Sequence, residues 1–215
     1  MLKVNKKKSE PEEFTKYKSK HKIINWDSFT PEIKQVLKQY LLEEQENSCC
    51  PYCEIEINLE NSHIEHIKPK NIFPNLLADY NNFIACCLTK KRCGNSKASK
   101  WSELFINPIT ENPEDYFEYD IKTGRMVPIF KEGEKYEKAK YTIDLLNLND
   151  NRLCEIRKKY IFEFLSFANF ESINSFFITS NLSLQIEELQ CINSGFDNVF
   201  PSNLLIFSTN FSNFF

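Results

Sequence analysis

The sequence predicts an α+β protein in which a small core of short strands and one helix lies inside a mainly helical shell. Cysteines gather in two groups, at 49–53 and 86–93, that bracket a segment with strand-like and turn-like character. Two of the three histidines fall within four residues of that segment, in the run His63-Ile64-Glu65-His66. Apolar residues at helical spacing follow and precede it, which is typical of helices that pack one face on a core.

Length and composition limit the classes of protein to consider. At 215 residues the chain is long enough for one sizeable domain, and no clear linker divides it. It has no apolar run of about 18 residues, so no membrane span is expected. The opening MLKVNKKK is not followed by the apolar stretch of a secretory signal. We therefore expect a cytoplasmic protein, and in that reducing compartment clustered cysteines indicate metal binding.

The first region, residues 1–48, is predicted to be an arm followed by a helix. Residues 1–25 are polar and rich in lysine, and we expect them to be partly extended. Thr30 followed by Pro31 and Glu32 is a typical helix start, with a capping hydroxyl, a proline at the first position and an early acid. The helix is expected to continue to about residue 46 and to lead into the first cysteines.

The second region, residues 49–105, carries the candidate chemistry. A short strand beginning near residue 54, a polar turn at 58–62 and a second strand at 63–67 are expected, with Pro69 ending the second strand. A loop at 71–81 leads to a strand at 82–86, and a short helix is expected at 95–104. The order is therefore strand, loop, strand and helix, with cysteines at both ends.

The remaining residues are predicted to form a shell and a distinct C-terminal segment. In residues 106–170 we expect a hairpin with Gly124 at its turn, a helix at 135–147 and a longer helix from about Asp150. Residues 171–215 are rich in Phe, Ser and Asn, and no Lys or Arg follows Lys159. This apolar segment either packs on the core or forms a surface that a partner covers.

Four thiols are predicted to form a structural zinc site. Cys50 and Cys53 have the spacing of a metal-binding knuckle, and Cys87 and Cys93 can complete a closed tetrahedral site. The register is open, because Cys49 can replace Cys50 and Cys86 can replace Cys87. The alternative is that these are ordinary buried cysteines.

The histidine segment is a candidate catalytic site. Histidine beside carboxylate provides a group that takes a proton near neutral pH and a group that holds a cation. On a strand, His63 and Glu65 share one face and His66 lies on the other, so a joint site requires a bulge or a strand end. The alternative is two surface histidines beside a glutamate.

Taken together, the stretches CCPYC, SHIEHIKPK, DYNNFIACC and CGNSK resemble the HNH endonuclease family, which implies a ββα-metal core with a four-cysteine zinc site. Beyond this core, LFINPITENPEDYFEYDIKTGRMVP and TIDLLNLNDNRLCEIRKKY resemble the retron-associated subfamily that includes the PtuB type of Septu anti-phage systems. The resemblance covers roughly residues 1–170.

The resemblance implies a role for each motif residue. His66 is the expected general base, and Glu65 is an expected ligand of a catalytic Mg²⁺ or Mn²⁺. Asn82 is expected to hold the His66 ring through its side-chain carbonyl, although Asn81 competes for that role. Asn95 is the expected second ligand of the catalytic ion.

One position departs from the family pattern. Many members place His or Asn directly after the last cysteine, whereas here Gly94 takes that place and Asn95 follows. Alternatively, therefore, His63 completes the metal site and Asn95 only caps the helix. For His63, however, the favoured interpretation is a contact with phosphate or support of a metal ligand, in preference to direct binding of the ion.

The formal charge of −3 argues against a general coat of positive charge, but a nuclease needs positive potential only at its cleft. Basic residues that surround the proposed site are expected to contact the phosphates of nucleic acid, unless they are only a solvated surface. They are Lys68, Lys70, Lys90, Lys91, Arg92, Lys97 and Lys100.

The expected function is metal-dependent cleavage of DNA in an anti-phage system. The subfamily implies an ABC-type ATPase of the PtuA type as partner, and a retron reverse transcriptase with its DNA as a further one. The chain has no GxxxxGK[ST] motif, so ATP control must come from another subunit. The alternatives are cleavage of RNA such as tRNA, and a non-catalytic zinc module that docks on an ATPase.

Overall fold

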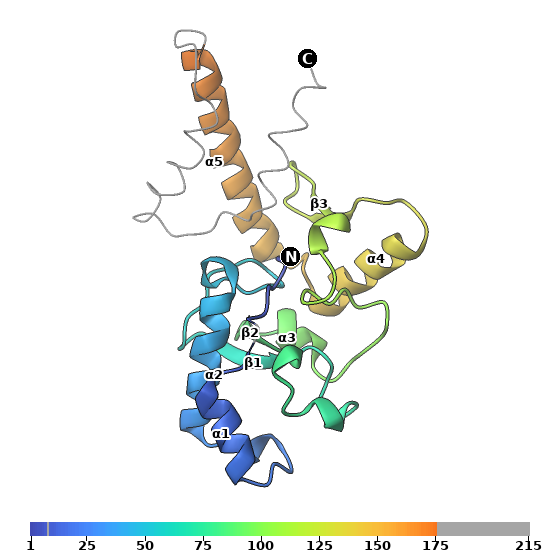
Figure 1. Cartoon of the computed structure of the whole chain (residues 1–215). Helices are drawn as coiled ribbons and strands as arrows, with labels where there is room; N and C mark the ends of the chain where they lie inside the picture. Colours follow the sequence, from blue (N-terminus) through green and yellow to red (C-terminus); the bar gives the residue numbers. More distant parts are fainter. Residues whose placement is uncertain (8, 176–215) are drawn as a thin grey trace.

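The protein is α+β, with two small antiparallel sheets among helices (Figure 1). A computed structural model describes residues 1–7 and 9–175, with residues 46 and 167–175 as backbone only. The elements are α1 (Glu12–Lys20), α2 (Pro31–Glu44), β1 (Ser62–His66), β2 (Phe83–Cys87), α3 (Cys93–Lys97), β3 (Phe117–Tyr119), β4 (Met126–Pro128), α4 (Glu134–Leu146) and α5 (Asn151–Ser175).

The expected extended arm instead contains helix α1. Its first turn carries Glu12 and Glu13, and its last turn carries basic residues, which complements the helix dipole. Phe14 is fully buried, and its ring stacks on Phe29 with centroids 5.2 Å apart. Because so few residues of this helix face the core, the sequence shows little apolar periodicity there and does not predict the helix.

Helix α2 begins where the sequence predicts. The Thr30 hydroxyl accepts a hydrogen bond from the backbone N–H of Ile33 at 3.5 Å, and Pro31 opens the helix. Leu37, Leu41 and Leu42 are buried on one face. The helix contacts α1 and β2, so it holds the first region against the central hairpin.

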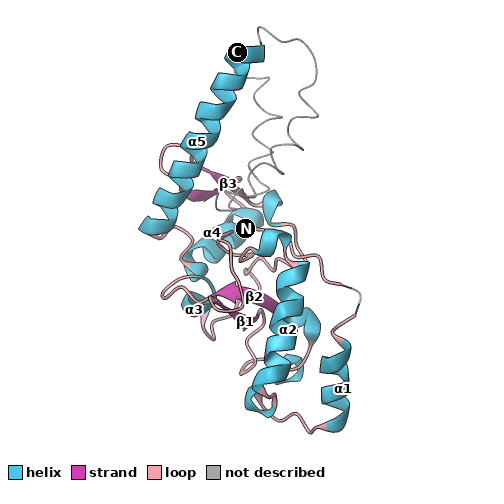
Figure 2. Ribbon diagram, turned by 90° about the vertical axis from the view of Figure 1, so that its left-hand side faces the viewer, coloured by secondary structure: helices cyan, strands magenta, loops and turns pink. Residues whose placement is uncertain are grey.

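The central sheet is the antiparallel pair β1–β2, in which Ser62 pairs with Cys87 and His66 with Phe83 (Figure 2). The strand expected near residue 54 does not form, and only an isolated bridge joins Cys49 to Glu56. The chain turns back on itself here, since the Glu54 N–H donates to the Cys50 carbonyl at 2.8 Å. A tight turn that brings two cysteines together cannot also be an extended strand.

Helix α3 is shorter and begins earlier than the predicted helix at 95–104. It starts at Cys93 and ends where Ala98 adopts a positive φ of 49°. Its first residue is therefore a cysteine of the metal-binding pattern, and its last residue is Lys97.

The outer part follows the sequence prediction more closely. Strands β3 and β4 form the expected hairpin, and α4 packs against both α3 and β4. Helix α5 extends away from the central sheet (Figures 1 and 2). The segment proposed for partner docking, residues 171–215, lies outside the described residues except for the backbone of α5 up to Ser175. Among the described helices, none combines the length and the apolar character needed to cross a membrane.

Candidate catalytic and metal-binding site

Four buried thiols meet at one end of the β1–β2 hairpin. Cys50 and Cys53 lie in the tight turn, Cys87 ends β2 and Cys93 begins α3. Their Sγ atoms all lie within 4.8 Å of one another. Four sulfur donors in this arrangement can hold one tetrahedral metal ion and leave no open position on it.

The two competing cysteines lie beside this group. The Cys49 thiol donates toward the Asn47 carbonyl at 3.6 Å. Cys86 Sγ lies 3.8 Å from Cys50 Sγ and accepts a hydrogen bond from the Gly94 N–H at 3.3 Å. The geometry therefore favours Cys50 and Cys87 as the members of the four-thiol set, with Cys86 as a sulfur that contacts it.

His66, the last residue of β1, has a ring that is held on several sides. The ring lies edge-on to Trp26 and Phe83, with centroids 4.8 Å away in both cases. Its Nε2 lies 3.1 Å from the carbonyl oxygen of Leu77. A carbonyl only accepts, so Nε2 carries the proton and Nδ1 keeps the lone pair.

The environment keeps the His66 ring neutral. Burial lowers the pKa of His66, and this outweighs the Leu77 carbonyl, which raises it. The other ring nitrogen, Nδ1, has no hydrogen-bond partner among the described residues, and it is not fully buried. A neutral imidazole whose lone pair reaches solvent can accept a proton from water.

Asn82 does not hold the His66 ring directly, contrary to the expectation. Its side-chain oxygen accepts from the Lys68 N–H at 2.8 Å, and its amide donates to the carbonyls of Lys68 at 3.0 Å and Leu76 at 3.3 Å. These bonds fix the loop between the two strands. Because Leu77 follows in that loop, Asn82 positions the carbonyl that contacts His66.

Glu65 lies on the face of β1 that α3 covers, together with His63. Lys97 is fully buried and donates to Glu65 Oε1 at 2.7 Å and to the His66 backbone carbonyl at 3.0 Å. Burial alone raises the pKa of Glu65, but His63 and Lys97 together lower it below its usual value. The carboxylate is therefore ionised, and its second oxygen, Oε2, lies 3.6 Å from His63 Nε2.

Asn95 does not join this group. Its side chain is exposed and donates to the Thr89 carbonyl at 3.1 Å. The residue of α3 that faces Glu65 and His63 is Gly94.

Two of the basic residues expected to contact phosphate are buried, so the expected set must be reduced. Lys97 is bound to Glu65, and Arg92 is 5% exposed and lies 3.7 Å from an Asp150 oxygen. Both positive charges are therefore balanced by carboxylates of the protein itself. The residues that keep exposed or partly exposed side chains are Lys68, Lys70, Lys90, Lys91 and Lys100.

Sequence reasoning missed aromatic residues that lie beside His66 or beside the two lysines that follow it. Lys70 lies over the Trp26 ring at 5.6 Å, and Lys68 lies over both Phe73, at 5.2 Å, and Trp101, at 5.4 Å. Trp26 and Trp101 are the two tryptophans of the chain, and both are partly exposed. The sequence could have pointed to these two tryptophans, because the chain has no others and lysines lie near both of them.

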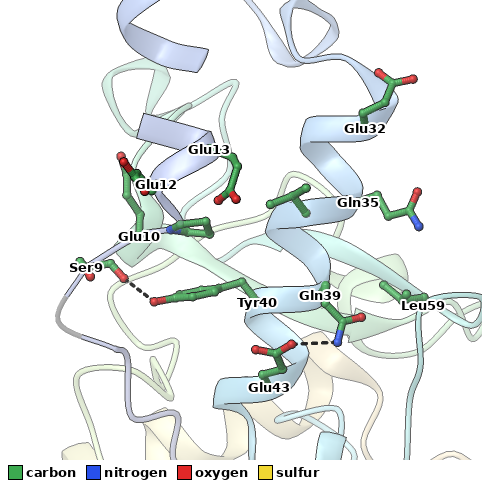
Figure 3. Close-up of a pocket in the computed structure, with 12 residues that line it drawn as sticks. Ser9, Glu10, Glu12, Glu13, Glu32, Gln35, Gln39, Tyr40, Glu43 and Leu59 are labelled. Atoms are coloured by element: carbon green, nitrogen blue, oxygen red, sulfur yellow. Dashed lines mark hydrogen bonds between the residues drawn. The ribbon is translucent and has the colours of Figure 1, made fainter. Parts of the chain in front are cut away.

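A pocket of about 670 Å³ lies elsewhere, between the start of α1 and α2 (Figure 3). It is lined by glutamates, including Glu10, Glu12 and Glu43, and by Tyr40, whose hydroxyl donates to the Ser9 carbonyl at 3.0 Å. It contains none of the candidate site residues. Its negative charge makes it unsuitable for a nucleic-acid backbone.

Comparison with known proteins identifies relatives among defence-system proteins. No protein-family model matches the chain. A Vibrio cholerae (serotype O1 biovar El Tor) protein, named as the candidate HNH endonuclease of retron Vc95, is 30% identical over 73% of this chain and 82% of its own length. The Septu protein PtuB of Bacillus thuringiensis is 33% identical over 54% of this chain and 42% of its own length.

A third relative is a much longer protein. The Septu protein PtuA of Bacillus mycoides (strain KBAB4) is 27% identical over 61% of this chain, but the match spans only 21% of PtuA. The extended match to the retron protein, together with the cysteine, histidine and glutamate arrangement, defines the relationship. The chain belongs to the HNH endonuclease family of the retron and Septu type.

Proposed function

We propose that this protein is a metal-dependent endonuclease that cleaves DNA in an anti-phage system, with β1, β2 and α3 as its ββα-metal core. The observation that carries the proposal is the state of His66. Its ring is fixed by the Leu77 carbonyl, its pKa is lowered by burial, and it lies next to an ionised Glu65. A fixed neutral base beside a carboxylate is what phosphodiester hydrolysis requires.

His66 acts as the general base. With its proton on Nε2, the ring accepts a proton from the attacking water at Nδ1. The positive charge that develops on the ring is stabilised by the Leu77 carbonyl and by the nearby Glu65 carboxylate, both of which raise the pKa of His66. Trp26 and Phe83 keep the ring from rotating away.

Glu65 is the proposed carboxylate ligand of the catalytic divalent ion. The ion would neutralise charge on the phosphate and on the leaving oxygen. Glu65 suits this role because Lys97 holds only Oε1 and leaves Oε2 beside His63. Lys97 also keeps the carboxylate oriented and ionised before any ion is bound.

The four thiols are proposed to hold Zn²⁺ as a structural ion. Their donor set is all sulfur, their burial excludes substrate, and the site is closed. This ion would join the turn at Cys50–Cys53 to the end of β2 and the start of α3.

Nucleic acid is proposed to cross the end of β1. Lys68 and Lys70 follow His66 in the chain, and their side chains lie beside Trp26, Phe73 and Trp101. Lysines contact phosphates, and aromatic rings stack on unpaired bases. Lys90, Lys91 and Lys100 are proposed to extend the contact along the backbone.

An ATPase of the PtuA type is the proposed partner, and a retron reverse transcriptase with its DNA is a further one. The support is the relative named PtuA, in which a sequence similar to this chain occupies part of a longer protein. A sequence that lies beside other segments in a relative is expected to work together with proteins similar to those segments. Co-purification of this chain with an ATPase encoded next to it tests the partnership.

The central test compares His66→Ala with His21→Ala, a control at the third histidine, which is exposed and stacks on Tyr17. We expect His66→Ala to lower DNA cleavage in Mg²⁺ or Mn²⁺ by about 10²- to 10⁴-fold with zinc content unchanged. His21→Ala should cleave like the wild type. If the folded His66→Ala variant cleaves normally, the catalytic assignment is wrong. Cleavage of RNA but not of DNA would reassign the substrate.

A further inference from the structure

Position 94 requires glycine because neighbouring side chains leave no room for a larger residue, and not because of its backbone conformation. Of the three glycines that the structure describes, Gly124 and Gly133 have positive φ and Gly94 does not, so Gly94 has a backbone that other residues adopt. A Cβ at position 94 would lie 2.9 Å from Glu65 Oε2 and 3.0 Å from His63 Nε2. Gly94 is therefore the place where α3 passes directly over these two side chains.

The imidazole of His63 fills the space that a side chain at position 94 would enter. His63 and Glu65 are two residues apart on β1, so their side chains share one face. Nε2 and Oε2 are 3.6 Å apart, too far for a strong hydrogen bond. Two donors that each reach an ion at about 2.1 Å can be separated by such a distance.

The neighbouring Asn95 is unavailable for this role, because its amide is exposed and bonded to the Thr89 carbonyl. His63, in contrast, has its Nδ1 buried without a partner among the described residues. Its Nε2 is directed at the one oxygen of Glu65 that Lys97 does not hold.

We infer that His63 is the second protein ligand of the catalytic ion and replaces the side chain that helix position 94 lacks. The inference rests on the proposed function and assigns a ligand of that same site. It also changes the expected metal preference. One imidazole nitrogen and one carboxylate oxygen form a softer donor set than oxygen alone, so the site binds Mn²⁺ more tightly than Mg²⁺.

Titration of the zinc-loaded full chain with Mn²⁺, followed by electron paramagnetic resonance and calorimetry, tests the assignment without nucleic acid. We expect His63→Ala to weaken Mn²⁺ binding by at least about tenfold, with zinc content and melting temperature retained. The matched control Asn95→Ala should bind Mn²⁺ like the wild type. His63→Phe, which keeps an aromatic ring but has no ligand atom, separates loss of the nitrogen ligand from loss of packing and should also bind weakly.

A double variant tests the replacement directly. His63→Ala removes one of the two side chains that a Cβ at position 94 would meet, and adding Gly94→Asn places an amide oxygen there on the helix, where Glu65 Oε2 must still give way slightly. The double variant should regain Mn²⁺ affinity over His63→Ala, whereas Gly94→Asn alone should not improve on the wild type, because its side chain meets both His63 and Glu65. A Gly94→Asn variant that alone binds Mn²⁺ more tightly than the wild type would overturn the replacement.

The ligand assignment and the nuclease assignment fail in different experiments. Wild-type Mn²⁺ affinity in His63→Ala, loss of affinity in Asn95→Ala, or tighter binding of Mg²⁺ than of Mn²⁺ by the wild type would each overturn the inference. None of these results depends on cleavage. A chain that loses Mn²⁺ on His63→Ala but cleaves neither DNA nor RNA would keep the ligand and refute the proposed function.

Discussion

The two ends of the β1–β2 hairpin both carry groups that can bind metal, but the two sets differ in chemistry and in how fully they are enclosed. At the Ser62–Cys87 end, four thiols converge and leave no free position on a bound ion. At the His66–Phe83 end, each polar group is hydrogen-bonded through one atom only: His66 through Nε2 to the Leu77 carbonyl, and Glu65 through Oε1 to Lys97. The end with four thiols is suited to a structural ion, and the end with His66 and Glu65 keeps atoms free to bind a catalytic ion or to accept a proton.

The largest effect is expected from opening the closed end with Cys50→Ser. A structural zinc contributes on the order of 10 kcal/mol in small zinc domains, which is comparable to the whole stability of a domain. We expect loss of zinc and of the cooperative thermal transition, measured by metal analysis and circular dichroism. Cys49→Ser is the neighbouring control and should keep both. A zinc-loaded, cooperatively melting Cys50→Ser protein would show that the register is wrong.

The next largest effect should come from removing the cation that holds Glu65. Lys97→Met leaves a carboxylate that is only 11% exposed without its nearest positive charge. Breaking such a buried pair from one side costs about 3 kcal/mol in the free energy of unfolding, as measured by denaturant titration. Lys100→Met, at an exposed lysine, should change it by less than about 0.5 kcal/mol. Equal stability of the two variants would contradict the buried pair.

A smaller effect is expected from Asn82→Ala, which removes three hydrogen bonds to the backbone of the loop. The expected loss is about 1–3 kcal/mol of stability. Cleavage should also fall, because Leu77 no longer holds the His66 ring. Asn81→Ala, at the exposed neighbour, provides the control for both readouts. If Asn82→Ala loses stability while the cleavage rate per folded molecule is normal, Asn82 has no part in positioning His66.

The smallest effect should follow from changing exposed charges, and it should appear in binding rather than in folding. The double variant of Lys68→Gln and Lys70→Gln should lower the slope of DNA affinity against salt concentration by about 1 to 2. Lys90→Gln with Lys91→Gln makes a matched pair farther from His66. If only the second pair alters the slope, nucleic acid does not cross the end of β1.

The sequence was most informative where local chemistry decides structure. The capping Thr30 with Pro31 located α2, and the spacing of Cys50, Cys53, Cys87 and Cys93 predicted the thiols that meet. Lysine was the least predictable residue type. A charge run suggests a surface, whereas Lys97 is buried because a carboxylate 32 residues away in the chain requires a partner.

The same limit applies to Asn82 and Gly94. A motif names the residue type at a position, but the carbonyl that reaches His66 belongs to Leu77, in a loop without a local signature. The role of Gly94 depends on how closely α3 approaches β1, a tertiary distance that a single sequence does not contain.

Helix α3 is only five residues long, yet it carries Cys93 at one end and Lys97 at the other. A helix this short is not stable by itself, so its position depends on its packing against α4 and β2 and, under the proposed roles, on the ion that Cys93 would help to hold. A chain without that ion would then hold Lys97 less firmly against Glu65. Metal supply would then act as a maturation checkpoint: newly made protein is harmless to its host's nucleic acid until zinc has been inserted.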